Sequence, residues 1–197
     1  MQRTAFQTPI IKQALALIGW LILKASGWQV KGKLPANLKQ AVIIGAPHTS
    51  NWDFPLAMAA LFTQGWPFYW VGKHSLFKGP AGVLMRFLGG IALNRSQAKN
   101  TVQAYAQLFS HNPELLLMLA PEGTRAKAAW RTGFYHIAHQ AGVPIIFGYL
   151  DQQSKSIGLG PAFYPSGDLH ADLKVIREFY QDKQGLIAKN FSLPHHL

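Results

Sequence analysis

The residues best suited to chemistry lie in GAPHTSNWDF, residues 45–54, where a histidine and an aspartate stand five positions apart. In one continuous helix, side chains at this spacing point about 140° away from each other, so His48 and Asp53 would not meet. If residues 49–51 form a turn, Asp53 can fold back and accept a hydrogen bond from the imidazole. That contact would fix the tautomer and leave the other ring nitrogen free to take a hydroxyl proton. The alternative is that His48 only packs and Asp53 stabilises the start of a helix.

No protein nucleophile accompanies this histidine. The sequence has no cysteine and no G-x-S-x-G motif, and Ser50 is only two residues from His48. A histidine base without a partner serine fits direct attack by a substrate hydroxyl on an acyl donor. The histidines at positions 136, 139, 195 and 196 do not form a ligand set for zinc, so we expect no metal and no other cofactor.

The segment PEGTR follows the apolar run ELLLMLA and is typical of a loop that binds an anion. Gly123 permits tight backbone geometry, Thr124 can donate a hydrogen bond, and Arg125 offers a planar fork of donors. Glu122 could orient that arginine. The alternative is an ordinary turn with an exposed salt bridge.

Length and composition limit the possible partners. A chain of 197 residues is expected to form one domain. Its 19 Lys and Arg against 8 Asp and Glu give a net charge of +11, which suits anionic lipids, phosphorylated small molecules or nucleic acid. The basic residues are scattered and no nucleic-acid motif is present, so we expect no nucleic-acid partner. The absence of cysteine excludes disulfides and is compatible with a reducing cytoplasm.

The N-terminal segment, residues 1–35, favours a membrane surface. Its apolar stretch at 14–23 is flanked by Lys12 and Lys24 and contains Trp20. The stretch is too short to span a bilayer, which takes about 20 apolar residues, and no signal-peptide cleavage site follows it. It is either a helix lying in the interface of an anionic membrane, with its lysines towards the phosphates, or an ordinary core helix. We expect the first.

The remainder, residues 36–197, alternates short apolar runs with longer periodic segments, which is typical of an α/β fold. We expect strands at 41–46, 67–72, 90–94, 114–120 and 143–150, and helices at 52–62, 75–89, 98–109, 132–141 and after an N-cap at Asp168. Polar residues follow four of these strands. If the strands share one direction, Lys73, Arg95 and PEGTR would join His48 along one rim of the sheet.

Taken together, these segments resemble the glycerolipid acyltransferase family, specifically the lysophosphatidic acid (1-acylglycerol-3-phosphate) acyltransferases and their lysophospholipid relatives. HTSNWD resembles the family's H-x4-D block, GGIALNR its second block, PEGTR its third and GVPIIFGYL its fourth, in order between about residues 40 and 150. The chain departs from the family at Pro47, Ala120 and Ala126, where the family commonly has asparagine, an aromatic residue and serine. None of these departures removes a proposed catalytic atom.

The resemblance implies transfer of a fatty acyl chain from acyl-CoA or acyl carrier protein to a hydroxyl of a lysophospholipid, above all 1-acylglycerol-3-phosphate, to give phosphatidic acid. His48 would be the general base and Asp53 its orienting partner, with no acyl-enzyme. The substrate-binding residues implied are Lys73, Arg95, Glu122, Gly123, Thr124 and Arg125.

The expected fold is therefore α/β, a single-domain mixed sheet flanked by helices like that of the glycerol-3-phosphate acyltransferases, with an N-terminal helix at the membrane interface. The expected place is the cytoplasmic face of the cell membrane, as a peripheral or monotopic protein. Three alternatives stay open: an acyltransferase with another acceptor, a thioesterase, and a non-catalytic protein that binds a membrane surface.

Overall fold

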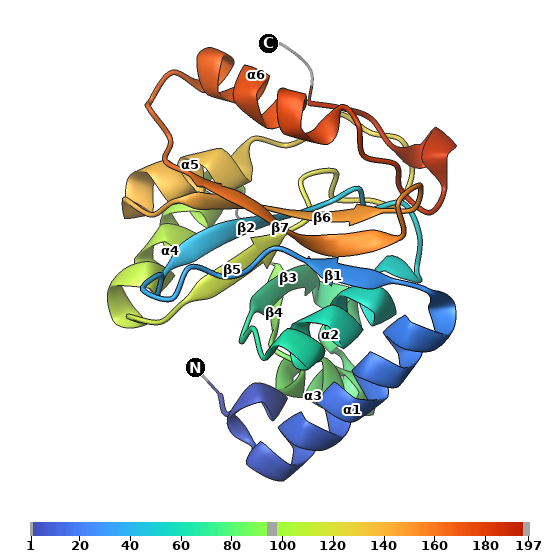
Figure 1. The fold of residues 1–197 in the computed structure, drawn as a ribbon. Helices are drawn as coiled ribbons and strands as arrows, with labels where there is room; N and C mark the ends of the chain where they lie inside the picture. Colours follow the sequence, from blue (N-terminus) through green and yellow to red (C-terminus); the bar gives the residue numbers. More distant parts are fainter. Residues whose placement is uncertain (1, 94–97, 195–197) are drawn as a thin grey trace.

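The fold is built on one mixed sheet. The computed structural model describes residues 2–93 and 98–194. Within them a seven-stranded sheet has the order β1-β7-β6-β2-β5-β3-β4 (Figure 1), and every neighbouring pair is parallel except β6 with β7. The strands are β1 (Gln29–Lys31), β2 (Ala41–Ala46), β3 (Tyr69–Lys73), β4 (Gly90–Leu93), β5 (Leu116–Leu119), β6 (Ile145–Asp151) and β7 (Ser156–Phe163). The expected single mixed sheet is confirmed.

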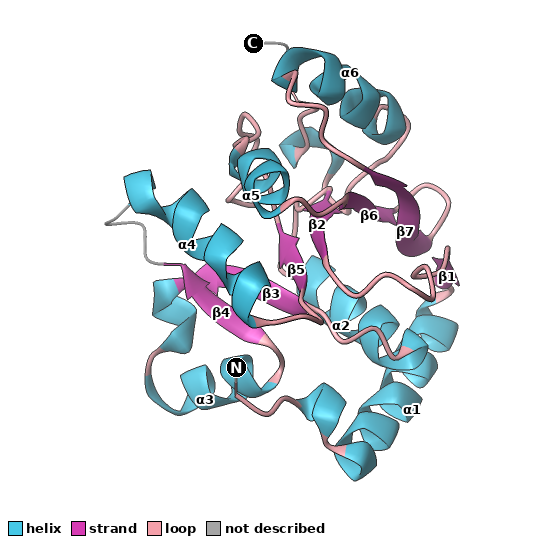
Figure 2. Cartoon of the chain, turned by 90° about the vertical axis from the view of Figure 1, so that its left-hand side faces the viewer, coloured by secondary structure: helices cyan, strands magenta, loops and turns pink. Residues whose placement is uncertain are grey.

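Helices cover both faces of this sheet. They are α1 (Pro9–Ser26), α2 (Asp53–Gln64), α3 (Gly79–Phe87), α4 (Ala98–His111), α5 (Gly133–Ala141) and α6 (Leu169–Tyr180). Figures 1 and 2 show α1, α2 and α3 on one side of the sheet and α4, α5 and α6 on the other.

The central strand β2 is buried on both faces, which explains its unbroken apolar sequence. Successive side chains of a strand point to opposite faces. Accordingly, Val42 and Ile44 pack with the core beneath α5 and α6, whereas Ala41 and Ile43 pack with the core beneath α2. Because β2, β5 and β3 run parallel, their carboxyl ends lie at the same edge of the sheet.

The sequence predicted the central strands and the α-helices after residue 50 to within about four residues, but it missed β1, β7 and the short 3-10 helix Ala188–Asn190. β1 has three residues, and β7 contains two glycines and a proline, so neither shows a clear strand period. The two strands approach closely at glycine. A Cβ built on Gly158 would lie 1.9 Å from the carbonyl oxygen of Lys31. Residues 1–35, expected to form a separate membrane segment, therefore also contribute a strand to the sheet.

The N-terminal helix α1 has one side packed on the protein and one side that exposes apolar residues. It begins at Pro9 and ends before Gly27, whose left-handed backbone caps it. One side packs closely on α2, because a Cβ on Gly19 would lie 2.7 Å from the carbonyl oxygen of Ala59. The other side exposes Leu17, Leu21 and further apolar residues. Of the helices in the described residues, α1 is the one that is long and apolar enough to cross a membrane, judged by length and composition.

Candidate active site

The turn between β2 and α2 brings His48 and Asp53 together. β2 ends at Ala46, the Ala46–Pro47 peptide is cis, and α2 begins at Asp53. Nδ1 of His48 lies 3.1 Å from Oδ2 of Asp53. The same carboxylate oxygen accepts hydrogen bonds from the backbone N–H groups of Thr49 at 2.6 Å and Ser50 at 2.8 Å. The reversal expected from the sequence is present, and one buried carboxylate holds both the turn and the imidazole.

This geometry assigns different tasks to the two ring nitrogens of His48. Nδ1 is engaged by Asp53, and no hydrogen bond within the described residues engages Nε2. The His48 side chain is 26% exposed, whereas that of Asp53 is 8% exposed. A histidine held in this way can present Nε2 to a hydroxyl group, while the carboxylate stabilises the imidazolium that forms.

Glu122 lies beneath the same turn. It is 2% exposed, and its Oε1 accepts a hydrogen bond from the backbone N–H of His48 at 3.1 Å. Burial raises the pKa of Glu122 to about 7, against the opposing effects of backbone hydrogen bonds and the nearby His48. Oε2 of Glu122 and Oδ1 of Asp53 are buried without a hydrogen-bond partner among the described residues. The histidine turn is therefore held by a hydrogen bond to Glu122 of the PEGTR segment.

The suggested pairing of Glu122 with Arg125 is not formed. The ion pairs of the described residues are Lys39 with Glu114 and His48 with Asp53. The reason is strand order: β5 lies directly beside β2, so the carboxylate that follows β5 reaches the backbone that follows β2.

The PEGTR loop turns at Gly123 and then exposes Arg125. The N–H of Gly123 donates to the carbonyl of Ala120 at 3.1 Å, and Gly123 has a positive φ of 62°, a conformation that glycine adopts most readily. Oγ1 of Thr124 accepts a hydrogen bond from the N–H of Ala126 at 3.3 Å. Thr124 thus shapes the loop, and no hydrogen bond among the described residues uses its hydroxyl proton, which could be donated to a substrate oxygen.

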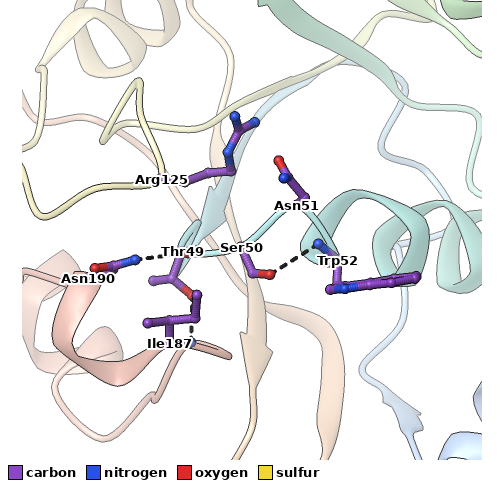
Figure 3. A pocket seen from close by; sticks show the side chains of 7 residues that line it. All are labelled: Thr49, Ser50, Asn51, Trp52, Arg125, Ile187 and Asn190. Carbon is purple, nitrogen blue, oxygen red and sulfur yellow. Dashed lines mark hydrogen bonds between the residues drawn. The ribbon is translucent and has the colours of Figure 1, made fainter.

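A pocket lies between this loop and the histidine turn (Figure 3). Its volume is about 370 Å³, and its lining residues are Thr49, Ser50, Asn51, Trp52, Arg125, Ile187 and Asn190. Figure 3 shows Arg125 and Asn51 on one side of the turn, with Asn190 and Ile187 beside Thr49 on the other. Sequence reasoning missed Ile187 and Asn190, because the C-terminal segment that carries them has no motif and no periodicity.

The two other predicted cations are placed differently. Lys73 is the last residue of β3 and is exposed at the sheet edge that carries His48, but β5 stands between β3 and β2. Lys73 does not line the pocket beside the turn. Arg95, which ends the second motif, lies outside the described residues.

Fold and site together define an α/β protein with a histidine–aspartate pair, a buried glutamate and an exposed arginine at the carboxyl edge of a mixed sheet. The chain belongs to the acyltransferase family, because the family model described as Acyltransferase matches residues 27–147. This match includes the turn, Lys73 and the PEGTR loop and ends before the C-terminal segment.

Curated relatives of the chain carry the name 1-acyl-sn-glycerol-3-phosphate acyltransferase. The protein of Haemophilus influenzae is 35% identical over an alignment of 131 positions that covers 61% of this chain and 52% of the relative. The protein of Salmonella typhimurium is 33% identical over an alignment of 144 positions that covers 68% of this chain and 57% of the relative. The chain thus spans little more than half the length of the curated relatives it matches.

A solved structure shows the same fold. It is the crystal structure of the 1-acyl-sn-glycerophosphate (LPA) acyltransferase PlsC from Thermotoga maritima. The TM-score is 0.60 at 16% identity, and the alignment covers 91% of this chain and 77% of the other.

Proposed function

We propose that the protein transfers a fatty acyl chain from acyl-CoA or acyl carrier protein to the hydroxyl of a lysophospholipid, with 1-acylglycerol-3-phosphate as the foremost acceptor and phosphatidic acid as the product. The observation that carries this proposal is the contact between Nδ1 of His48 and Asp53 at 3.1 Å, beside a pocket that Arg125 lines. The names of the relatives support the choice of acceptor.

The reaction needs a base, a thioester and no protein nucleophile. Nε2 of His48 takes the proton of the acceptor hydroxyl while the hydroxyl oxygen attacks the thioester carbonyl carbon. Asp53 stabilises the resulting imidazolium. When the tetrahedral intermediate collapses, the carbon–sulfur bond breaks, and the departing thiolate takes the proton from His48. An ester and a free thiol are formed, and the base is restored.

The acceptor's phosphate is assigned to Arg125. A guanidinium group can bind two phosphate oxygens through parallel hydrogen bonds. Arg125 is exposed and belongs to no ion pair of the described residues, so it is available to an anion. Gly123 and Thr124 set the path of the loop. Lys73 is proposed to add positive charge along the rim, and Arg95 to contribute charge to phosphate binding.

The test is a panel of lysolipid acceptors with one long-chain acyl-CoA and the matching acyl carrier protein thioester. We expect kcat/KM to be at least about tenfold higher for 1-acylglycerol-3-phosphate than for monoacylglycerol, which has no phosphate. Replacing Arg125 by alanine should lower kcat/KM for the phosphorylated acceptor by roughly 10- to 100-fold, because hydrogen bonds to a charged group contribute about 1.5–3 kcal/mol. Its effect on monoacylglycerol should be small.

The control for Arg125→Ala is Arg3→Ala, which removes an exposed arginine ahead of α1 that donates a hydrogen bond to the carbonyl of Gln7. Failure of every acceptor with both donors would overturn the proposal. Release of free acid at the same rate without any acceptor would identify a thioesterase instead.

The membrane is the proposed partner of the exposed side of α1. Ile10 is 83% exposed, Leu17 60% and Leu21 51%. Nζ of Lys24 lies 4.7 Å from the ring centroid of Trp20, a pair that suits the level of the lipid headgroups. The opposite side of α1 is packed on α2, so we propose that the helix lies in the interface and does not cross the bilayer. We place the protein on the cytoplasmic face, where the thioester donors are available.

A second apolar surface lies at the same side of the molecule. Val83 is 68% exposed and Leu84 53% exposed on α3, with Lys78 immediately before this helix. Figures 1 and 2 both show α3 on the same side of the sheet as α1. Two exposed apolar surfaces with lysines beside them favour docking on an anionic bilayer.

Charge introduced on α1 should release the protein from membranes. We expect Leu17→Glu combined with Leu21→Glu to reduce binding to phosphatidylglycerol-containing vesicles by about tenfold or more, because two apolar side chains leave the interface and negative charge is added. Cosedimentation at several salt concentrations measures this effect. Val175→Glu, at an exposed position of α6 on the other side of the sheet, should bind as the unchanged protein does. Equal binding by the α1 double variant would contradict the membrane proposal.

A further inference from the structure

The geometry points to a positioning role for the C-terminal tail, residues 184–194. We propose that this tail fixes the turn that carries His48 and holds it at a set place relative to Arg125. The tail follows α6 and lies outside residues 27–147, the part matched by the family model. The proposal rests on the acyltransferase function proposed above.

The tail encloses Thr49, the residue next to His48. The backbone N–H of Ile187 donates to Oγ1 of Thr49 at 3.1 Å, and Nδ2 of Asn190 donates to the carbonyl of Thr49 at 3.3 Å. Thr49 is 1% exposed. Gly185 lies so close that a Cβ there would come within 2.6 Å of the Thr49 side chain. Asp53 holds the N–H of Thr49 at 2.6 Å, so hydrogen bonds from two directions fix this one residue.

The first end of the tail is anchored at the carboxyl end of β6. The N–H of Gln184 donates to Oδ1 of Asp151 at 3.0 Å. The N–H of Gln152 donates to the carbonyl of Gln184 at 2.7 Å. Because β6 is the neighbour of β2, this anchor places the tail directly beside the turn.

The second end of the tail is anchored to the loop that carries Arg125. Nε1 of Trp130 donates to the carbonyl of Ser192 at 2.7 Å, and the hydroxyl of Ser192 donates to the carbonyl of Ala128. The tail therefore runs from β6 across the histidine turn to the arginine loop. A segment tied to both loops restricts how far they can move apart, and small displacements of reacting groups cost large factors in rate.

The lining of the pocket includes residues from the tail, the histidine turn and the arginine loop. Ile187 and Asn190 supply one side of its lining, and the turn and Arg125 supply the rest. Figure 3 shows the amide of Asn190 directed at the backbone of Thr49. Loss of that amide would free one side of the turn without removing any group assigned to proton transfer or phosphate binding.

The test compares Asn190→Ala with Asn112→Ala. In both residues a side-chain amide donates to a backbone carbonyl, but Asn112 bonds to Leu108 at the end of α4, away from the pocket. We expect similar losses of thermal stability. We expect kcat to fall roughly tenfold in Asn190→Ala alone, with KM for the thioester donor unchanged.

Hydrogen exchange gives a second measurement that does not depend on activity. The amide protons of Thr49 and Ser50 should exchange roughly tenfold faster in Asn190→Ala than in Asn112→Ala, because opening of the turn becomes easier. If acyl transfer is present but the two variants agree in kcat and in exchange, the tail proposal is overturned and the proposed function stands. If the unchanged protein transfers no acyl group, the proposed function fails, and faster exchange in Asn190→Ala would still support the positioning role.

Discussion

Replacing His48 with alanine is expected to lower kcat for acyl transfer by about a thousandfold, because general base catalysis typically contributes 10²- to 10⁴-fold. The variant keeps the carboxylate of Asp53 and its two backbone hydrogen bonds, so the turn should still form. Acyl-CoA consumption, followed by release of free thiol at saturating acceptor, measures the effect. Lysolipid binding should be nearly unchanged, since the phosphate is assigned to Arg125.

The control for this variant is His111→Ala, which removes an exposed histidine at the end of α4. Its kcat should equal that of the unchanged protein. The kcat of Asp53→Asn should lie between those of His48→Ala and His111→Ala. The amide oxygen of asparagine can still accept hydrogen bonds from the N–H groups of the turn, but it lacks the charge that stabilises the imidazolium. Retention of full activity by His48→Ala would show that another group is the base, and the mechanism proposed for this site would be abandoned.

The contact between His48 and Asp53 could be predicted because it is local. The two residues are five positions apart, and only a turn had to be assumed between a continuous apolar strand and a periodic helix. The central strand β2 could also be predicted from the sequence. It is buried on both faces and therefore carries the uninterrupted apolar run AVIIGA.

The support of the site could not be predicted, because it depends on strand order and distant packing. Glu122 stands three residues before Arg125, which suggests a pair, yet the order of β2 and β5 directs its carboxylate to the backbone of His48. Ile187 bonds to Thr49 across 138 positions of sequence. Neither the composition nor the hydrophobic periodicity of the tail predicts such a contact.

Replacing Glu122 with glutamine is expected to remove a large part of the pH dependence of stability. The buried carboxyl group titrates with a pKa of about 7 in the folded protein, compared with its ordinary value of 4.5. Between these values the folded protein keeps a proton that the unfolded chain releases. Stability therefore falls as pH rises from about 4.5 to 7, by roughly 3 kcal/mol from this group alone. Glutamine has no proton to release.

Chemical denaturation between pH 5 and pH 8 tests this expectation. Across that range the unfolding free energy of Glu122→Gln should rise relative to that of the unchanged protein by about 2.5 kcal/mol, since titrations common to both cancel. Glu178→Gln, on the exposed side of α6, should give a difference that hardly changes with pH. Parallel curves for Glu122→Gln and the unchanged protein would contradict a buried carboxyl group that titrates near neutral pH.

The direction of this effect also bears on the function proposed for His48. An ionised carboxylate accepts a stronger hydrogen bond than a neutral acid does, and Oε1 of Glu122 accepts the N–H of His48. Raising the pH through 7 therefore strengthens the attachment of the turn while it weakens the fold as a whole. Glu122 is costly to bury in its charged form, and its carboxyl group accepts the backbone N–H of the proposed base, so we propose that it positions His48.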